Sequence, residues 1–187
     1  MGITGQKTIE VGILKAPSVS FTLDGNFGDF SGDFTAFAEN GKIRFQDRTG
    51  DKFVFRPNDP GSSFVLKDVV IGIDFHWERK EDQRFRGLLV LIPEEGMVRA
   101  VNVLPVEDYL ISVIASEMSA TSTPEYLKAH AVISRSWLLS QIEKRRGIEQ
   151  QKKEYRSEVR TETEWIKWWD REDHTLFDVC ADDHCQR

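Results

Sequence analysis

The sequence predicts an α+β fold in which a β-rich N-terminal half is followed by a helical core and a segment rich in cysteine and histidine. Three observations support this fold class. Short runs of strand-forming residues, broken by Gly, Asp, Asn and Pro, fill residues 7–103. Apolar residues then switch to a helical spacing near residue 106. Both cysteines and two of the four histidines lie within residues 174–185.

The composition is typical of a globular domain. The 187 residues, of which 40% are hydrophobic and 30% charged, are enough for a substantial core. A formal net charge of -6 argues against nucleic acid as a partner, because phosphate binding depends on clustered Lys and Arg. No stretch approaches the roughly 18 consecutive apolar residues that cross a bilayer. Residues 1–4 do not resemble a signal peptide, so we expect any export signal to be absent from this form of the chain.

Strands are expected throughout the first half of the chain. The strand-like runs cover residues 8–14, 19–23, 52–55, 69–73, 87–92 and 97–103. The turn-forming residues cluster at 24–33, 47–51 and 57–63. We therefore divide the chain into a β-rich part, residues 1–95, and a core, residues 96–187.

Two helices are expected in the core. The first covers residues 106–118 and has two acids in its first turn, where the helix dipole favours anions. Its apolar positions are Leu110, Val113, Ile114 and Met118. The second helix is indicated by Thr123 as its cap, Pro124 at its first position and Gly147 as its stop after a basic run. Its apolar stripe is formed by Leu127, Ala131, Leu138 and Ile142.

Arg135 falls on the apolar stripe of the second helix, between Ala131 and Leu138. A guanidinium on a buried face is costly unless a carboxylate pairs with it. We expect either that Glu107 pairs with Arg135 or that the arginine side chain extends to the edge of the helix and reaches water.

Residues 149–173 are polar and charged and are expected to form an inserted helical segment. This segment contains three tryptophans, Trp165, Trp168 and Trp169. Such a cluster either stacks on sugar rings or, more commonly, packs on its own domain.

The C-terminal segment fits a tetrahedral Zn²⁺ site, because thiolate and imidazole are the preferred ligands of this ion. Its four potential ligands are His174, Cys180, His184 and Cys185. A site with four protein ligands would be structural, since it leaves no open position for water. Two alternatives stay open: the cysteines form a disulfide in an oxidising compartment, or they are ordinary thiols.

Glu117 is the residue best suited to acid chemistry. It lies at the end of the first predicted helix, beside Ile114 and Met118. A carboxyl that is partly buried among apolar side chains keeps its proton more readily and can deliver it at neutral pH. The alternative is an ordinary solvated surface group. His130 is interpreted as a residue at the edge of the core rather than a base. No motif for nucleotide binding or for a serine nucleophile occurs.

Residues 98–140 contain several marks of one known family: VNVLPVEDYL, SEM, a helix that begins with proline and contains LKAHAV, and Arg135 where the family has Ala-Arg-Thr. The stretch resembles the core of the stage II sporulation protein D and LytB amidase-enhancer family. The opening TIEVGIL is similar to the first strand of that family, and DHCQ is similar to its Cys/His segment.

The resemblance implies that the helical core is catalytic and that the protein is a peptidoglycan lytic transglycosylase. Such enzymes cleave the bond between N-acetylmuramic acid and N-acetylglucosamine and leave a 1,6-anhydro sugar. The resemblance implies Glu117, in SEM, as the catalytic acid, and it implies a structural Zn²⁺ held by His174, Cys180, His184 and Cys185. We assign substrate binding to Arg135 and to the two serines that flank the acid, Ser116 and Ser119.

The resemblance also implies partners and a location. The expected partners are peptidoglycan glycan strands and a cell-wall amidase, and the expected location is extracytoplasmic, in the cell wall or periplasm. A non-catalytic module that binds glycan or enhances an amidase is the alternative function.

The chain departs from the family pattern at three positions. Ser112, His130 and Ser136 stand where Gly, Gln and Thr are common in the family. Domains of the family continue past the DHCQ segment, so we expect this chain to be truncated on its C-terminal side and to lack part of the substrate cleft.

Overall fold

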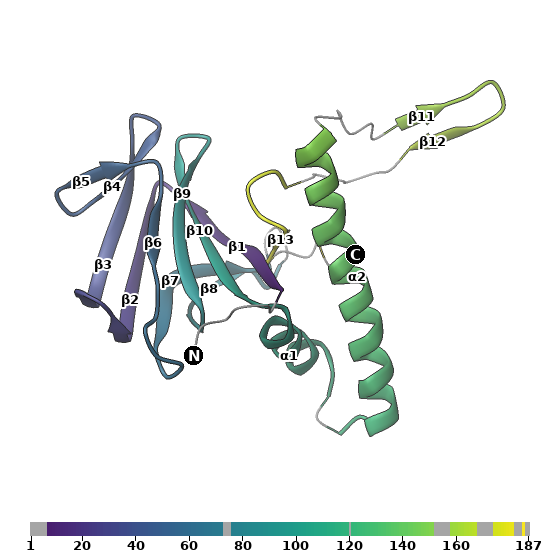
Figure 1. The fold of residues 1–187 in the computed structure, drawn as a ribbon, viewed down its shortest axis with the longest axis horizontal. Helices are drawn as coiled ribbons and strands as arrows, with labels where there is room; N and C mark the ends of the chain where they lie inside the picture. Colours follow the sequence, from purple (N-terminus) through teal and green to yellow (C-terminus); the bar gives the residue numbers. More distant parts are fainter. Residues whose placement is uncertain are drawn as a thin grey trace.

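A computed structural model describes residues 7–72, 76–119, 121–151, 158–167, 174–181 and 185. Within these residues, ten strands precede two helices and three short strands follow them (Figure 1). The elements are β1 (Thr8–Ala16), β2 (Ser18–Phe27), β3 (Phe30–Glu39), β4 (Lys42–Phe45), β5 (Arg48–Gly50), β6 (Phe53–Phe55), β7 (Ser63–Ile71), β8 (Arg79–Phe85), β9 (Leu88–Glu94), β10 (Met97–Pro105), α1 (Val106–Glu117), α2 (Pro124–Gln151), β11 (Glu158–Arg160), β12 (Trp165–Lys167) and β13 (Val179–Cys180).

The strands form two main sheets. The six-stranded sheet has the order β5-β4-β3-β2-β7-β8, and the five-stranded sheet has the order β13-β1-β10-β9-β6. In β2, Val19, Phe21 and Leu23 are buried while the residues between them are partly exposed, because successive side chains of a strand point to opposite faces. In the five-stranded sheet, β1 pairs antiparallel with β10 and parallel with β13, which joins the N-terminal strand to the C-terminal segment.

The main hydrophobic core lies between the two sheets and is rich in phenylalanine. The ring centroid of Phe55 is 5.1 Å from those of both Phe21 and Phe45. Aromatic rings each bury a large apolar area, so such a cluster contributes strongly to the stability of a small domain. The buried members of this core are Val19, Phe21, Leu23, Phe27, Ala36, Ile43, Phe45, Phe55, Phe64, Leu66, Val69, Leu89, Leu91, Val98 and Ala100.

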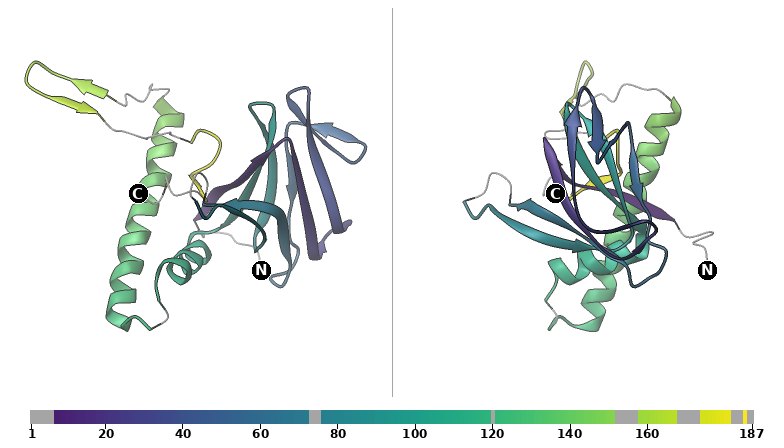
Figure 2. Two further views of the ribbon diagram at one scale, coloured as in Figure 1. Left: turned by 180° about the vertical axis from the view of Figure 1, so that it is seen from behind. Right: turned by 90° about the vertical axis from the view of Figure 1, so that its left-hand side faces the viewer.

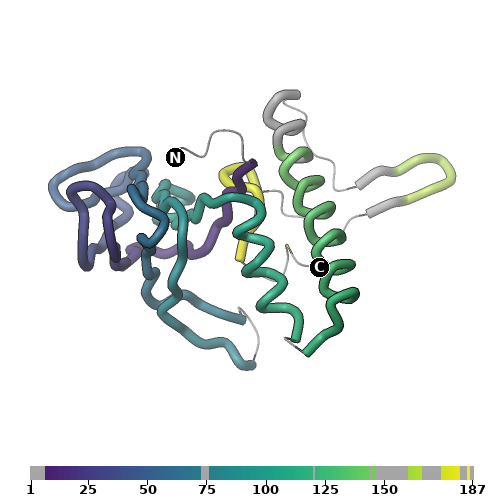
Figure 3. The backbone as a smooth tube through the Cα atoms, turned by 60° about the horizontal axis from the view of Figure 1, so that its bottom comes forward, coloured from purple at the N-terminus to yellow at the C-terminus, as the bar shows by residue number. Residues whose placement is uncertain are grey.

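The other face of the five-stranded sheet is covered by the helices and by the Cys/His segment. Leu110 of α1 and Leu138 of α2 pack with Ile9 of β1. Phe177, just before β13, packs with Val90 of β9. Figures 2 and 3 show the result, with α1 between the sheets and the long helix α2. The five-stranded sheet is therefore the platform on which the candidate site is built.

The predicted α+β class, with a β-rich first half and two helices, is confirmed, but the sequence analysis missed β3, β4, β5 and β8. Strand β8 has the sequence RKEDQRF and no apolar alternation, because it is an edge strand on which charges discourage pairing with another chain. The turn expected over 24–33 is reduced to residues 28 and 29, because β2 and β3 both run into that region.

Both helices begin where the sequence predicts. The backbone N–H of Tyr126 donates to Thr123 Oγ1 at 3.3 Å, which is the expected cap of α2. The predicted stop at Gly147 is wrong, since α2 continues to Gln151. Glycine costs only about 1 kcal/mol inside a helix, and good helix formers follow it here. Neither helix of the described part is long and apolar enough to span a membrane.

The helical segment expected over residues 149–173 is wrong for residues 158–167, which form the antiparallel hairpin β11-β12. In the hairpin, Val159 lies opposite Ile166, and β-branched residues of this kind favour strands. The hairpin extends away from the sheets, beyond the C-terminal end of α2 (Figure 1).

The tryptophans of this segment are described only in part. Trp165 is 63% exposed, and the guanidinium carbon of Arg160 lies 5.9 Å from its ring centroid. Trp165 therefore does not pack into the core of its own domain. Trp168 and Trp169 lie outside the described residues.

The division of the chain at residue 95 stays a prediction. Backbone pairing crosses this position, since Ile9 of β1 lies opposite Leu104 of β10. The first strand of the β-rich part and the first strand of the core thus share one sheet.

Candidate functional site

Glu117 is the last residue of α1, and packing fixes this helix on the sheet. At its start, the backbone N–H of Val106 donates to the carbonyl of Lys7 at 3.0 Å. One turn later, Leu110 is buried with Leu138 of α2. This anchoring holds Glu117 at the corner where the chain turns from α1 towards α2.

The carboxyl of Glu117 faces His130 across the two helices. Its Oε2 lies 3.1 Å from Nε2 of His130, and Nδ1 of the same ring lies 3.5 Å from the hydroxyl of Ser134. The Glu117 side chain is 31% exposed and the His130 side chain 17% exposed. The carboxyl is therefore fixed by one neighbour and remains within reach of a ligand. The sequence interpretation of His130 as a core-edge residue missed this contact.

The order serine, imidazole, carboxylate is also that of serine hydrolases, but the surroundings do not suit that chemistry. Ser134 lies inside α2, where the helix uses the backbone N–H groups for its own hydrogen bonds. A serine hydrolase needs backbone or side-chain donors directed at the oxyanion beside the nucleophile. Ser134 is better explained as a residue that orients the imidazole ring.

Arg135 and Glu107 form the ion pair that the sequence suggested, with 2.9 Å between Nε and Oε1. Both side chains are about half exposed, so Arg135 lies at the edge of the helix interface and the pair contributes at most about 1 kcal/mol. The hydroxyl of Ser116 donates to the carbonyl of Val113 at 2.9 Å. The hydroxyl of Ser119 lies 2.7 Å from that of Thr121. Their assignment to substrate binding stays a prediction.

Three of the four predicted metal ligands come together beside β13. The sulfurs of Cys180 and Cys185 are 3.4 Å apart, and Nε2 of His174 is 3.3 Å from the Cys185 sulfur. A disulfide has a sulfur–sulfur bond of about 2.05 Å, so the two cysteines are not bonded to each other. The fourth predicted ligand, His184, lies outside the described residues.

The described donor atoms fit a zinc ion. The ligand atoms of His174, Cys180 and Cys185 all lie within 4.8 Å of one another. Tetrahedral coordination with metal–sulfur bonds of about 2.3 Å places two sulfurs about 3.8 Å apart, close to the separation seen here. The backbone N–H of Cys180 also donates to the Cys185 sulfur at 3.2 Å, which favours a thiolate. This group could bind a metal ion.

Gly12 of β1 provides the space that lets the Cys/His segment dock on the sheet. Cys180 lies opposite Gly12 in the β1-β13 pairing, and the backbone N–H of Ala181 donates to the Gly12 carbonyl at 2.9 Å. A Cβ at Gly12 would lie 2.6 Å from Cζ of Phe177, which is fully buried. The aromatic ring therefore occupies the place of the missing side chain.

Gly12→Ala is expected to destabilise the protein by about 1 to 3 kcal/mol, because the new methyl group must displace the Phe177 ring from a packed site. Urea denaturation measures the effect. Gly50→Ala is the matched control, since its Cβ would meet Phe53 at an ordinary 3.6 Å. Equal loss of stability in the two variants would contradict the role given to Gly12.

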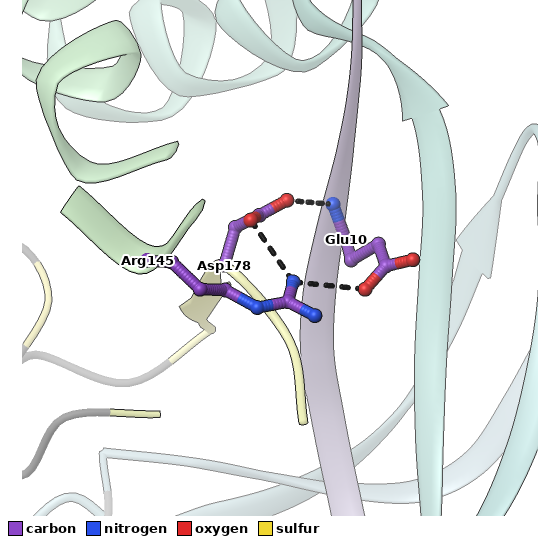
Figure 4. Close-up of polar contacts among 3 residues, drawn as sticks. All are labelled: Glu10, Arg145 and Asp178. Carbon is purple, nitrogen blue, oxygen red and sulfur yellow. Dashed lines mark hydrogen bonds and ion pairs between the residues drawn. The ribbon is translucent and has the colours of Figure 1, made fainter. Parts of the chain in front are cut away.

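A charged network ties the end of α2 to the same segment (Figure 4). One guanidinium nitrogen, Nη1 of Arg145, lies 2.9 Å from a carboxylate oxygen of both Glu10 and Asp178. The other oxygen of Asp178 accepts the backbone N–H of Glu10 at 2.8 Å. Burial lowers the pKa of Arg145, but the hydrogen bonds and charges of the two acids outweigh it, and the pKa is raised. In the sequence, Arg145 belongs to the basic run before Gly147, and nothing in that run indicates this network.

Asp178→Ala is expected to cost about 3 kcal/mol, because it leaves the partly buried guanidinium of Arg145 without its most buried partner. Glu10→Gln should cost less than about 1 kcal/mol, since the Glu10 side chain is 39% exposed. Urea unfolding of the two variants side by side tests the difference. A smaller loss in Asp178→Ala than in Glu10→Gln would overturn this account of the network.

Tyr109 links the two parts of the site. Burial raises the pKa of Tyr109 to about 12, and the charges of Cys185, Cys180 and Glu117 add to this effect. Glu117 and the Cys/His group thus act electrostatically on the same phenol. Its hydroxyl stays neutral over the whole physiological range.

Comparison with known protein families shows to which family the chain belongs. The sequence model of the stage II sporulation protein (SpoIID) family matches residues 94–187. The chain belongs to this family. The matched half includes α1, α2 and the Cys/His segment, and it confirms the resemblance seen in residues 98–140. No curated protein and no solved structure matches the chain.

Membership of the SpoIID family indicates a cell-wall-related function. Within the family segment, the sequence predicted that the Cys/His residues come together, which holds for His174, Cys180 and Cys185. The role of Glu117 stays a prediction, and its contact with His130 was missed. The available signal was the departure of this chain from the glutamine that is common at position 130. Tyr109 carried no such signal, because its position depends on how α1 packs beside the C-terminal segment.

Proposed function

We propose that this SpoIID family member is a peptidoglycan lytic transglycosylase with Glu117 as its single catalytic acid. The observation that supports this role most directly is the partly exposed carboxyl at the end of α1, held on one side by His130. The residue lies in the SEM motif, within the half of the chain that matches the family.

The proposed reaction needs one carboxyl group that changes role. Glu117 donates its proton to the glycosidic oxygen as the bond to C1 of N-acetylmuramic acid breaks. The 6-hydroxyl of the same sugar attacks C1 and forms the 1,6-anhydro ring. Its proton returns to the carboxylate of Glu117, so no water is consumed and the acid is regenerated.

The geometry of α1 supports a mechanism with one carboxyl. Ordinary glycosidases place two carboxyl groups on opposite sides of the bond, roughly 5 to 10 Å apart. The other acids of α1, Glu107 and Asp108, precede Glu117 by about 14 to 15 Å along the helix axis at about 1.5 Å per residue. Glu107 is also engaged by Arg135. Neither acid is placed to assist at the bond that Glu117 would protonate.

The proposal assigns substrate contacts to the same corner of the structure. Ser116 and Ser119 flank Glu117, and both are exposed. Arg135 is half exposed and can exchange Glu107 for an anionic group of the substrate, such as the lactyl carboxylate of muramic acid. The proposed partners are peptidoglycan glycan strands and a cell-wall amidase, and the proposed location is extracytoplasmic, in the cell wall or periplasm.

We also propose that the Cys/His group binds a structural Zn²⁺. The residues that would hold the ion are His174, Cys180 and Cys185, with His184 as the fourth ligand predicted from the sequence. Four protein ligands leave no position for a reacting water, so the ion would hold the segment against β1 and take no part in bond cleavage.

The test of the proposed function is to incubate the purified protein with glycan strands that lack stem peptides and to analyse the products by mass spectrometry. New 1,6-anhydro-muramic acid ends are expected. Binding of the strands without any new ends would contradict the enzyme and favour a glycan-binding module. The exposed Trp165 on the β11-β12 hairpin is the feature that such a module would use to stack on sugars.

A further inference from the structure

The contact of Glu117 with His130 indicates that a second residue takes part in the proposed mechanism. The imidazole has a polar neighbour at each nitrogen: the Glu117 carboxylate at 3.1 Å from Nε2 and the Ser134 hydroxyl at 3.5 Å from Nδ1. The three residues come from two helices that also pack through Leu110 and Leu138. The ring is therefore held both by its own helix and by the residue that it faces.

We propose that His130 is a positioning residue for Glu117, which fixes one carboxyl oxygen and, through its own charge, sets how readily Glu117 keeps the proton that it donates. The inference rests on the proposed role of Glu117 as the acid. It assigns to His130 a function that a glutamine at this position would fulfil only in part.

The positioning part follows from the hydrogen bond. A glutamate at the end of a helix has three rotatable side-chain bonds, and a catalytic acid must present its proton in one direction. His130 engages Oε2, while among the described residues Oε1 of Glu117 makes no hydrogen bond. The fixed oxygen orients the carboxyl, and the other oxygen is left for the glycosidic bond.

The proton-coupling part follows from linkage between two groups in contact. A charged imidazole stabilises the neighbouring carboxylate, so a proton on His130 makes a proton on Glu117 less favourable, and the effect is reciprocal. Two described groups lie next to the pair: Ser134, which faces the ring, and Tyr109, on which the charge of Glu117 acts. Ser134 is uncharged, and Tyr109, which feels the charge of Glu117, stays neutral because its pKa is raised to about 12. Cys180 and Cys185 face Tyr109 from the C-terminal segment.

The coupling between His130 and Glu117 predicts the direction in which cleavage changes with pH. In a lone carboxyl above its pKa, the protonated fraction rises about tenfold for each unit that the pH falls. A histidine side chain in general changes charge between roughly pH 5 and 8. A positive charge on the imidazole, 3.1 Å from the carboxyl, opposes protonation of Glu117. Cleavage by the unaltered protein should therefore level off as the pH falls, whereas cleavage with an uncharged partner should keep rising.

The first test compares three forms of the protein: unaltered, His130→Gln and His130→Leu. Glutamine can still donate a hydrogen bond to Glu117 but does not titrate, and leucine does neither. The quantity compared is the cleavage rate of His130→Gln divided by that of the unaltered protein at the same pH. This ratio is expected to rise about tenfold as the pH falls from about 8 to about 5.5. In His130→Leu, kcat should fall about tenfold or more with little change in KM, because orientation is lost. The proposal would be overturned if the cleavage rate of His130→Gln relative to the unaltered protein were the same at every pH and if the two variants had equal kcat values.

The second test needs no activity. The ring signals of His130 are followed by NMR as a function of pH in the unaltered protein and in Glu117→Gln. Removal of the carboxylate should change the pH dependence of the His130 ring signals, while the signals of the exposed His76 should be the same in both proteins. An identical His130 titration in both proteins would show that the two groups are not coupled.

The two tests separate the inference from the proposed function. If no form of the protein cleaves glycan at any pH, the transglycosylase proposal fails and the NMR comparison alone decides the pairing. If cleavage is seen and the His130 titration is unaffected by Glu117→Gln, the enzyme stands and the inference about His130 is wrong. If His130→Gln fails to fold, the NMR comparison of the unaltered protein with Glu117→Gln still shows whether the two groups are coupled.

Discussion

Glu117→Gln is expected to reduce the formation of 1,6-anhydro ends by about 100- to 10,000-fold, the range that general acid–base catalysis contributes. The amide has nearly the same shape as the carboxyl and can still contact His130, but it cannot donate a proton to the glycosidic oxygen or accept one from the 6-hydroxyl. The change therefore removes both steps of the proposed mechanism and leaves the surroundings of residue 117 intact. Counting the new ends by mass spectrometry measures the loss.

Glu125→Gln is the matched control for this variant. Glu125 is an exposed acid in the first turn of α2, close in sequence to Glu117 but outside the proposed site. It should retain cleavage within about twofold, as surface substitutions usually have small effects. Both variants should keep the thermal unfolding midpoint of the unaltered protein within a few degrees. Full activity in Glu117→Gln would remove the assignment of the catalytic acid.

Removal of the proposed Zn²⁺ by a strong chelator is expected to have the largest effect on stability. Structural zinc contributes about 10 to 16 kcal/mol of binding free energy in small zinc domains, and about 4 kcal/mol alone would lower the unfolding midpoint by about 8 to 16 °C in a chain of this size. The β1-β13 pairing should open first, because β13 is only two residues long and contains a ligand, Cys180. Amide exchange of Ala181, which donates to Gly12, reports this opening.

Single variants show whether the predicted ligands are responsible. His174→Ala should lose bound zinc and the stability that the ion gives, whereas His76→Ala, which changes an exposed histidine far from the Cys/His group in sequence, should keep both. Elemental analysis should find about one zinc per chain in the unaltered protein. A protein that contains no metal and unfolds at the same temperature with and without chelator would rule out the structural ion.

The parts of the fold that the sequence predicts correctly are those with a strong local signal. The start of α2 follows from Thr123 and Pro124, which cap the helix in the structure as expected. The buried face of α2 follows from Leu138 and Ile142, which are fully buried. Arg135 was expected either to pair with Glu107 or to reach water at the helix edge, and the half-exposed ion pair combines the two.

The parts that were missed depend on contacts between distant segments. Strand β8 is mostly charged, with five charged residues among its seven, and it is defined by its pairing with β7. The sequence does not predict the hairpin β11-β12, because a short polar segment carries no clear period. The contact of His130 with Glu117 depends on the angle at which α1 meets α2, and no local pattern in either helix specifies that angle.

Glu117 is proposed to drive an intramolecular transfer to the 6-hydroxyl, and the most direct test is to run the reaction with stem-peptide-free glycan in ¹⁸O-labelled water. We expect new muramic acid ends that contain no ¹⁸O and are lighter by one water than hydrolysed ends, with at least about 100-fold fewer formed by Glu117→Gln. New reducing ends formed in place of anhydro ends would contradict this transfer, because they would mean that water, and not the sugar's own hydroxyl, attacks C1.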